Sequence, residues 1–285
     1  MAVDNASITE VVLGGTRGGP DVKTLREDKW WKLPLVTVLG LSAFVVYATW
    51  AAVWGDSNFF YLPHNIISPF YSPCLAHACK AAGDTGSPVF DWWRLSPALI
   101  ILVFPLGFRM TCYYYRKAYY RSFWRAPVAC AVQDARPGYT GETRAPLIIQ
   151  NIHRYFFYAG LVFNVLLTID AVQGFIWPTL HHQLVHGQYV TQSGGFGMSV
   201  GSLVLCVNAT LLWIYSLSCH ACRHLCGGQI RSFSKHPIRH KLWKFVTPLN
   251  ARHMTFAWCS LFFVAFTDLY VRLVASGTIT DFKIF

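Results

Sequence analysis

The stretch LPLVTVLGLSAFVVYATWAAVW, residues 33 to 54, holds 22 consecutive residues without a charged side chain. A helix of about 20 apolar residues crosses the hydrocarbon core of a bilayer, whereas an open strand would leave backbone groups unpaired in lipid. Four further stretches share this apolar character. We therefore predict an all-α integral membrane bundle of five transmembrane helices, with spans at about residues 33–54, 95–115, 148–169, 198–218 and 254–274.

The overall composition is that of a membrane protein. Hydrophobic residues make up 54% of the 285 residues and charged residues only 13%, which is more apolar than a soluble core requires. The net charge of +11 would suit nucleic acid, but the basic residues occur in short blocks between apolar runs, so we expect no nucleic-acid partner. Residues 1–32 carry no apolar signal-peptide core, and we interpret them as a cytoplasmic segment that precedes an anchor domain at residues 33–285.

The distribution of basic residues predicts the orientation in the membrane. Of the 24 Lys and Arg residues, 20 lie in the amino-terminal segment, in the second and fourth connections, or at the start of the third span. Because Lys and Arg concentrate in cytoplasmic loops, we expect a cytoplasmic amino terminus and, after five spans, a carboxyl terminus outside. The four remaining basic residues fall on the other side: Lys80, Arg94, Arg272 and Lys283.

Two of the nine cysteines, Cys74 and Cys79, lie in the long outer connection at residues 55–94. In an oxidising outer compartment, the spacing favours a disulfide between them. Free thiols are one alternative, and a metal held together with His77 is another.

Most of the other cysteines fall on the cytoplasmic side, where structural disulfides are disfavoured. The string SCHACRHLCGG, residues 218 to 228, follows the fourth span. If that helix continues past Ser218, its thiols share one stripe at i, i+3 and i+7, and its imidazoles form an adjoining i, i+4 pair. These side chains are Cys219, Cys222, Cys226, His220 and His224.

Further donors lie at the cytoplasmic ends of other spans. Cys112 closes the second span, His153 opens the third and His253 opens the fifth, so antiparallel packing places them in the same layer as the string above. Ordinary packing of buried cysteines and interfacial histidines is the simpler interpretation of any one residue. Donors from four helices in one layer together favour a metal centre.

Three kinds of metal centre remain open. Zinc accepts Cys and His equally but leaves the five spans unexplained. Haem b needs paired histidines, which are available among His153, His220, His224 and His253. A Rieske-type 2Fe–2S cluster, held by two Cys and two His, uses the donors concentrated here and suits electron transfer to a quinone. We favour the Rieske-type cluster, although only half of the soluble Rieske pattern is present, as Cys222-Arg223-His224.

Cationic and phenolic side chains occur at the same level of the predicted bundle. They could hold a quinone headgroup while its tail lies in lipid. Arginines that extend to the interface beside interfacial tyrosines are the alternative. The candidate quinone-binding residues are Arg109, Tyr113, Arg116, Arg154 and Tyr155. Asp170 and Asp268, near the outer ends of the third and fifth spans, are either end caps or part of a proton route.

Several strings carry a family resemblance. The tyrosine-rich string is the most specific, and the similarity runs from about Leu25 to the carboxyl terminus. The chain resembles the membrane-anchor (cytochrome b, SdhC-like) subunit of the mycobacterial and actinobacterial type of succinate dehydrogenase. The strings are SPFYSPC (68–74), FRMTCYYYRKAYYRSFW (108–124), ETRAPLIIQNIHRYFFY (142–158), SCHACRHLCGG (218–228), FSKHPIRH (233–240) and LNARHMTFAW (249–258).

The resemblance implies a five-helix anchor in the bacterial plasma membrane that binds an FAD-containing flavoprotein subunit and an iron-sulfur subunit on its cytoplasmic face. It implies a Rieske-type cluster in place of haem, and a quinone substrate, menaquinone or ubiquinone. A higher-order oligomer of the complex is a further expectation. Our preferred ligand quartet is Cys219 and Cys222 with His153 and His253. The full set of metal candidates is Cys112, His153, Cys219, Cys222, His220, His224 and His253.

Two functions from other classes would also explain the spans and the Cys/His layer. One is a haem b anchor of another quinone-linked dehydrogenase. The other is a zinc-stabilised membrane scaffold or transporter.

Overall fold

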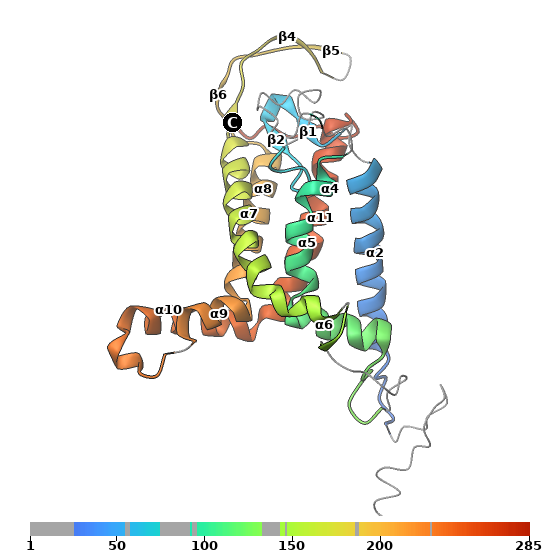
Figure 1. The fold of residues 1–285 in the computed structure, drawn as a ribbon. Coiled ribbons are helices and arrows are strands. Elements are labelled where there is room, and N and C mark those ends of the chain that lie inside the picture. Colours follow the sequence, from blue (N-terminus) through green and yellow to red (C-terminus); the bar gives the residue numbers. More distant parts are fainter. Residues whose placement is uncertain are drawn as a thin grey trace, which may run out of the picture. The chain divides into compact units, whose positions relative to one another are not determined.

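The computed structural model describes residues 26–54, 58–74, 92, 96–132, 143–145, 147–185, 188–228 and 230–285. Within the chain there are two compact units, each described by itself below. The first comprises Met1–Ala43 and Tyr113–Gln150, and the second comprises Phe44–Cys112 and Asn151–Phe285. Figure 1 shows that helices dominate the fold.

Long apolar helices confirm the prediction of a mostly helical membrane protein. Among the described residues, four helices are long and apolar enough to cross a bilayer, and a fifth results if one broken pair of helices counts as a single span. The number five and the direction of the termini remain predictions. The four helices are Lys32–Trp54 (α2), Ile148–Gln173, which contains α7 (His153–Gln173), Val200–Leu217 (α8) and His253–Ala275 (α11); the broken pair is Ala98–Met110 with Tyr113–Trp124.

The second unit contains the helical bundle. In it α5 (Val103–Met110) packs on α7, α7 packs on α8, and α8 packs on α11. Glycines allow the close approach of α5 and α7: a Cβ on Gly107 would lie 2.3 Å from the Phe156 ring, and one on Gly160 would lie 3.0 Å from Phe108. Small residues at such crossings let membrane helices pack tightly.

The predicted span at residues 95–115 is not one continuous helix. It begins as α4 (Ala98–Ile101), is interrupted at Leu102, and continues as α5 until Met110. Pro105 explains the interruption, because it has no N–H to donate to the carbonyl of Ile101. A second break at Thr111 and Cys112 separates α5 from α6 (Tyr113–Tyr119).

The first unit contains the start of α2, α6, a π-helical turn at Tyr120–Trp124 and most of the 3-10 helix Leu147–Ile152. Arg26 links the amino-terminal part to the later segment, since its guanidinium donates to the carbonyl of Cys130 at 2.8 Å. The Tyr120 hydroxyl donates to the Gln150 amide oxygen at 3.3 Å.

Short antiparallel strands cover the other end of the bundle in the second unit, and the sequence prediction of an all-α fold did not include them. Within the described residues, three two-stranded sheets form there. They pair β1 (Phe60–Tyr61) with β2 (Ile66–Ile67), β3 (Ile176–Trp177) with β6 (Gly195–Phe196), and β4 (Leu180–Val185) with β5 (Gln188–Gln192).

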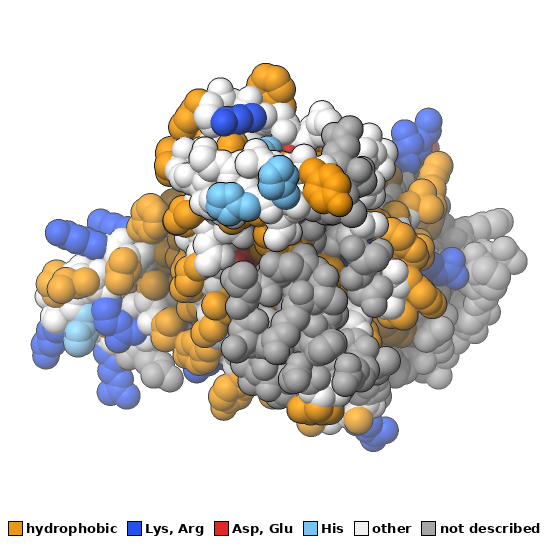
Figure 2. Space-filling model, turned by 90° about the horizontal axis from the view of Figure 1, so that it is seen from above, with side chains coloured by type: hydrophobic (Ala, Val, Ile, Leu, Met, Phe, Trp, Pro, Cys, Tyr) orange, Lys and Arg blue, Asp and Glu red, His pale blue; other side chains and the backbone are white. Residues whose placement is uncertain are grey.

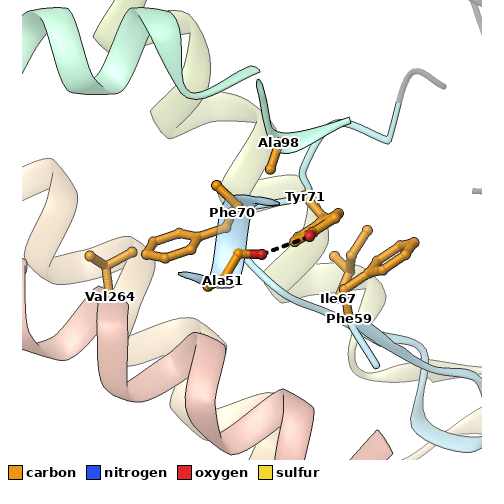
Figure 3. Packing of buried hydrophobic residues seen from close by; sticks show 8 residues of the cluster. Ala51, Phe59, Ile67, Phe70, Tyr71, Ala98 and Val264 are labelled. Carbon is orange, nitrogen blue, oxygen red and sulfur yellow. Dashed lines mark hydrogen bonds between the residues drawn. The ribbon is translucent and has the colours of Figure 1, made fainter. Parts of the chain in front are cut away.

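A buried apolar cluster anchors the segment after β2 to the bundle. Phe59 and Tyr71 stack at 4.4 Å, and the Tyr71 hydroxyl donates to the carbonyl of Ala51 at 2.8 Å. Figure 3 shows these side chains in one cluster that also contains Phe70 and Val264. The packing fixes the segment against both α2 and α11.

Asp281 fastens the carboxyl-terminal segment to the start of α8. Its carboxylate contacts His64 Nδ1 at 2.6 Å and accepts from the Tyr270 hydroxyl at 2.7 Å and the Gly201 amide at 2.8 Å. Burial alone would raise the pKa of Asp281, but the hydrogen bonds, with that from His64 first, outweigh it and lower the pKa below 3.8.

Asp281→Asn is therefore expected to weaken the docking of residues 282–285 by about 1.5 to 3 kcal/mol at neutral pH, the usual contribution of hydrogen bonds to a charged group. Because the pKa is lower in the folded state, this stabilisation is complete above pH 3.8 and is lost as the pH falls through the folded value. Hydrogen exchange of the terminal amides across this range measures it. A variant as well protected as the wild type at neutral pH would contradict the assignment.

Candidate metal centre

Four helix ends of the second unit bring two thiols and two imidazoles together. Cys112 follows the end of α5, His153 starts α7, Cys219 follows the end of α8, and His253 starts α11. Cys112 Sγ lies 3.3 Å from His253 Nε2, and Cys219 Sγ lies 3.1 Å from His153 Nε2. Both thiols are only 1% exposed. The layer expected from the helix ends therefore contains two contacting Cys–His pairs.

The imidazole of His153 is fixed in one tautomer by its neighbours. The Thr111 hydroxyl lies 2.8 Å from Nδ1 and donates its own proton to the carbonyl of Gly107 at 2.7 Å. The hydroxyl oxygen must then accept from Nδ1–H, which leaves Nε2 as the unprotonated nitrogen that faces Cys219. Phe108 stacks on the ring at 5.2 Å and holds its plane.

His253 is held in the same way by a different helix end. The Ser218 hydroxyl donates to the carbonyl of Tyr215 at 2.8 Å and lies 2.7 Å from His253 Nδ1. Tyr215 also stacks on the ring at 5.2 Å. Both histidines thus direct an acceptor nitrogen at a thiol while the other nitrogen is hydrogen-bonded, which is the usual support of a metal-binding histidine.

Sequence reasoning missed the two hydroxyls, Thr111 and Ser218. Each stands directly before one of the paired cysteines, in the dipeptides Thr111-Cys112 and Ser218-Cys219. A small hydroxyl residue beside a cysteine at a helix end was the available signal.

The fourth span does not continue past Ser218. The predicted stripe of Cys219, Cys222 and Cys226 on one helix required that it did. Helix α8 ends at Leu217, Cys219 has an extended backbone, and a new helix, α9 (His220–Gly227), starts after it. The hydrogen bond from the Ser218 hydroxyl to the carbonyl of Tyr215, and that from the Asn250 amide to the carbonyl of Ser218, stabilise this break. Cys219 is thereby separated from the stripe and placed against His153.

The other candidates on α9 have different surroundings. Cys222 is buried, and its thiol interacts electrostatically with that of Cys226, one turn later. His220 and His224 are exposed. Burial, reinforced by Cys226, raises the pKa of the Cys222 thiol to about 12. Burial and the nearby Cys112 likewise raise the pKa of Cys219 to about 12, so these thiols are neutral unless a bound cation stabilises the thiolates.

Within the described part of the chain, no three His, Cys, Asp or Glu side chains are close enough to hold a metal ion as they stand. The donors form two contacting pairs, and Cys112 of one pair lies near Cys219 of the other. Their chemistry, two sulfur and two imidazole ligands, fits an iron–sulfur cluster of the Rieske type, and it also fits zinc.

The predicted quinone-binding residues are divided between the two units. Arg109 lies inside the bundle, where its guanidinium donates to the Ser260 hydroxyl at 3.2 Å and its Cζ lies 4.6 Å from the ring centre of Tyr215. Arg154 contacts His224 Nδ1 at 3.1 Å on the surface. Tyr155, on α7, is 72% exposed. The remaining two, Tyr113 and Arg116, stack on each other in the first unit.

A hollow of about 120 Å³ lies beside the α9 histidines. It is smaller than the roughly 300 to 1,000 Å³ of typical small-molecule sites, so it does not enclose a quinone headgroup by itself. Its lining is basic and aromatic: His220, Arg223, His224, Gly227, Gly228 and Trp243.

Of the predicted outer cysteine pair, Cys74 is disulfide-bonded. Cys79 and His77 lie outside the described residues. The pairing of Cys74 with Cys79 therefore stays a prediction.

Comparison with known proteins decides the family. The profile described as actinobacterial succinate dehydrogenase subunit SdhC matches residues 32–277. The chain belongs to this SdhC family. A chain of the Mycobacterium smegmatis Sdh1 complex in the apo form is 48% identical, with a TM-score of 0.81, over 95% of this chain and 97% of that one. No curated protein matches.

Family membership confirms the predicted resemblance and identifies the chain as the non-flavin membrane subunit of a succinate dehydrogenase. The apolar helices agree with a multi-pass protein of the bacterial plasma membrane. On α7 the exposed side chains form an apolar face, as a lipid-facing helix requires. They are Val162, Val165, Ile169 and Val172, each 47% to 60% exposed.

Proposed function

We propose that this SdhC subunit anchors an FAD-containing flavoprotein and an iron–sulfur subunit to the cytoplasmic face and delivers their electrons to quinone. We also propose that Cys112, Cys219, His153 and His253 hold a Rieske-type 2Fe–2S cluster. The observation that carries the second proposal is the pair of Cys–His contacts at 3.3 and 3.1 Å, in which each imidazole directs Nε2 at a thiol. A cluster with two Cys and two His ligands supplies one-electron transfer at a raised potential.

This quartet differs from the one preferred from the sequence in one ligand, because Cys112 replaces Cys222. Cys222 is engaged by Cys226 within α9, whereas Cys112 contacts His253 directly. A haem b anchor would use the two imidazoles and leave unexplained why each of them faces a buried thiol. Haem b and zinc remain the alternatives that the experiment below separates.

The residues around the quartet suit electron and proton delivery to quinone. The oxidation of succinate to fumarate releases two electrons and two protons, and reduction of quinone to quinol takes up two of each. The positively charged guanidinium of Arg109 lies beside the ring of Tyr215, and this ring stacks on His253. The positive charge therefore favours the arrival of an electron near His253. Exposed His220 and His224 are placed to relay protons from water.

The orientation and the five-span count belong to the same proposal. The four donors mark one end of the bundle, and the connections at that end carry most of the Lys and Arg, which supports a cytoplasmic position. Ala98–Met110 spans 13 residues, about 20 Å of helix. That is shorter than the hydrocarbon core of about 30 Å, so we propose a short second span that ends at the cluster.

Optical and EPR spectra of the purified complex test this function. We expect an EPR signal of Rieske type in the reduced complex, in addition to the signals of the partner subunits, and no haem Soret band. A Soret band that shifts on reduction would favour the haem b anchor. Stoichiometric zinc, without iron beyond that of the partner subunits, would favour a structural zinc site.

The hydrogen bond that His153 Nδ1 donates to the Thr111 hydroxyl predicts a graded effect. Thr111→Val keeps the side-chain volume but frees His153 Nδ1, and loss of such a partner typically costs about 10- to 100-fold in metal affinity or activity. We expect a similar fall in quinone reduction, measured with succinate in membranes. Thr210→Val removes a hydroxyl that donates to the carbonyl of Cys206 in its own helix and serves as the control. Equal activities of the two variants would contradict the orienting role.

A further inference from the structure

Helices α9 and α10 (Pro237–Ala251) form an arm beside the end of the bundle that holds the quartet. In Figure 1 the arm runs sideways, across the direction of α7 and α8. Its two helices are tightly joined. A Cβ on Gly227 would lie 2.2 Å from Trp243, and Arg239 donates to the carbonyl of Cys226 at 3.0 Å. The two helices of the arm therefore have a fixed packing, and each helix has one side against the other helix and one side away from it.

One face of α10 carries an exposed apolar stripe. Ile238, Leu242 and Phe245 stand at i, i+4 and i+7, so they share one side of the helix, and they are 74%, 49% and 62% exposed. Val246, on the side toward α9, is only 2% exposed. Three large apolar side chains in line on a short helix indicate a surface that meets an apolar partner.

Positive charge borders this stripe. Lys241 and Lys244 are exposed on the same helix. Between residues 218 and 253 the sequence has no Asp or Glu. In Figure 2, the arm on the left shows hydrophobic side chains with Lys and Arg along its edge. The basic residues of the segment are Arg223, Arg231, Lys235, Arg239, Lys241, Lys244 and Arg252.

The chain connection fixes the level of this helix. Only Arg252 separates the end of α10 at Ala251 from the start of the spanning helix α11 at His253. A helix that runs sideways at the point where a span begins lies at the boundary between headgroups and acyl chains. An apolar stripe with a basic border is the pattern of a helix that rests in that boundary on anionic lipid.

We propose that α10 is an interfacial helix that binds anionic phospholipid, with Ile238, Leu242 and Phe245 among the acyl chains and Lys241 and Lys244 at the phosphates. This lipid-binding proposal rests on the membrane location of the subunit and is independent of the metal quartet. The acyl chains account for the apolar stripe, and the phosphates account for the basic border that a neutral lipid would not attract.

Photocrosslinking from Phe245 tests the apolar contact. The whole complex, with benzoylphenylalanine at this position, is placed in nanodiscs of phosphatidylcholine with phosphatidylglycerol and irradiated, and the adducts are identified by mass spectrometry. We expect lipid adducts at Phe245 at least several-fold above those at His236, which precedes α10 off the stripe. Adducts to another subunit, or equal lipid adducts at both positions, would overturn the proposal.

The lysines test the charge preference. Lys241→Ala with Lys244→Ala is expected to lower the enrichment of phosphatidylglycerol over phosphatidylcholine among the Phe245 adducts on the order of tenfold. Arg231→Ala with Lys235→Ala removes the same charge outside α10 and should leave that enrichment close to its original value. Equal losses in the two double variants would overturn the assigned site. Unchanged succinate–quinone activity throughout would show that the quartet is not involved.

Discussion

Replacement of Cys112 or Cys219 by serine is expected to abolish the EPR signal of the membrane cluster and to lower quinone reduction by more than about 100-fold. Each thiol faces an imidazole nitrogen, at 3.3 and 3.1 Å, and a serine hydroxyl is a harder ligand that suits iron–sulfur chemistry poorly. Because loss of a residue that merely orients a ligand costs about 10- to 100-fold, loss of a ligand itself costs more. EPR of the reduced complex and succinate–quinone activity measure both effects.

Cys222→Ser is the matched control. It removes a thiol that is similarly buried, 6% exposed, but engaged by Cys226 instead of an imidazole, so we expect it to retain the signal. Oxidation of succinate with an artificial acceptor should persist in all three variants, which shows that the partner subunits are assembled. Loss of the signal in Cys222→Ser with retention in Cys112→Ser would support the quartet first favoured by the sequence.

Asp268→Asn is expected to destabilise the subunit by about 3 to 5 kcal/mol, the cost of leaving one buried charge without its partner. Asp268 is completely buried, and its carboxylate accepts from Arg272 Nε at 2.8 Å and from the Tyr47 hydroxyl at 2.6 Å. A further bond comes from the Ser68 hydroxyl. Arg272 also donates to the carbonyl of Ala51 at 3.1 Å. The charged pair thus ties α11 to α2 and to the segment after β2.

Thermal unfolding of the detergent-solubilised complex measures this loss. The double variant Asp268→Leu with Arg272→Met removes both charges and is expected to be more stable than either single variant, because a buried pair replaced by apolar groups costs little. A single variant as stable as the wild type would contradict the structural role. Lost activity with unchanged stability would instead favour the proton route considered from the sequence.

The spans that the sequence predicted best are those whose limits depend on apolar length alone. Residues 33–54, 198–218 and 254–274 correspond to α2, α8 and α11 within two residues at each end. The second span differs, because its breaks depend on Pro105 and on the turn at Thr111 and Cys112. The strands at the other end of the bundle were missed because each is short and lies in a connecting segment.

The sequence predicted that the donors at the helix ends lie at a similar depth. It did not predict which thiol faces which imidazole. Helix-end positions placed Cys112, His153 and His253 together, since antiparallel helices of similar length end at one depth. The break between Ser218 and Cys219 could not be predicted, because it depends on hydrogen bonds from Ser218 and from the distant Asn250. That break decides which thiol faces His153.

A density map of the intact complex would show which side chains hold the metal. We expect strong density for a two-iron cluster bounded by the side chains of Cys112, Cys219, His153 and His253. Ligation through Cys222, a porphyrin between the two histidines, or four side chains in direct contact with no inorganic density between them would contradict this expectation.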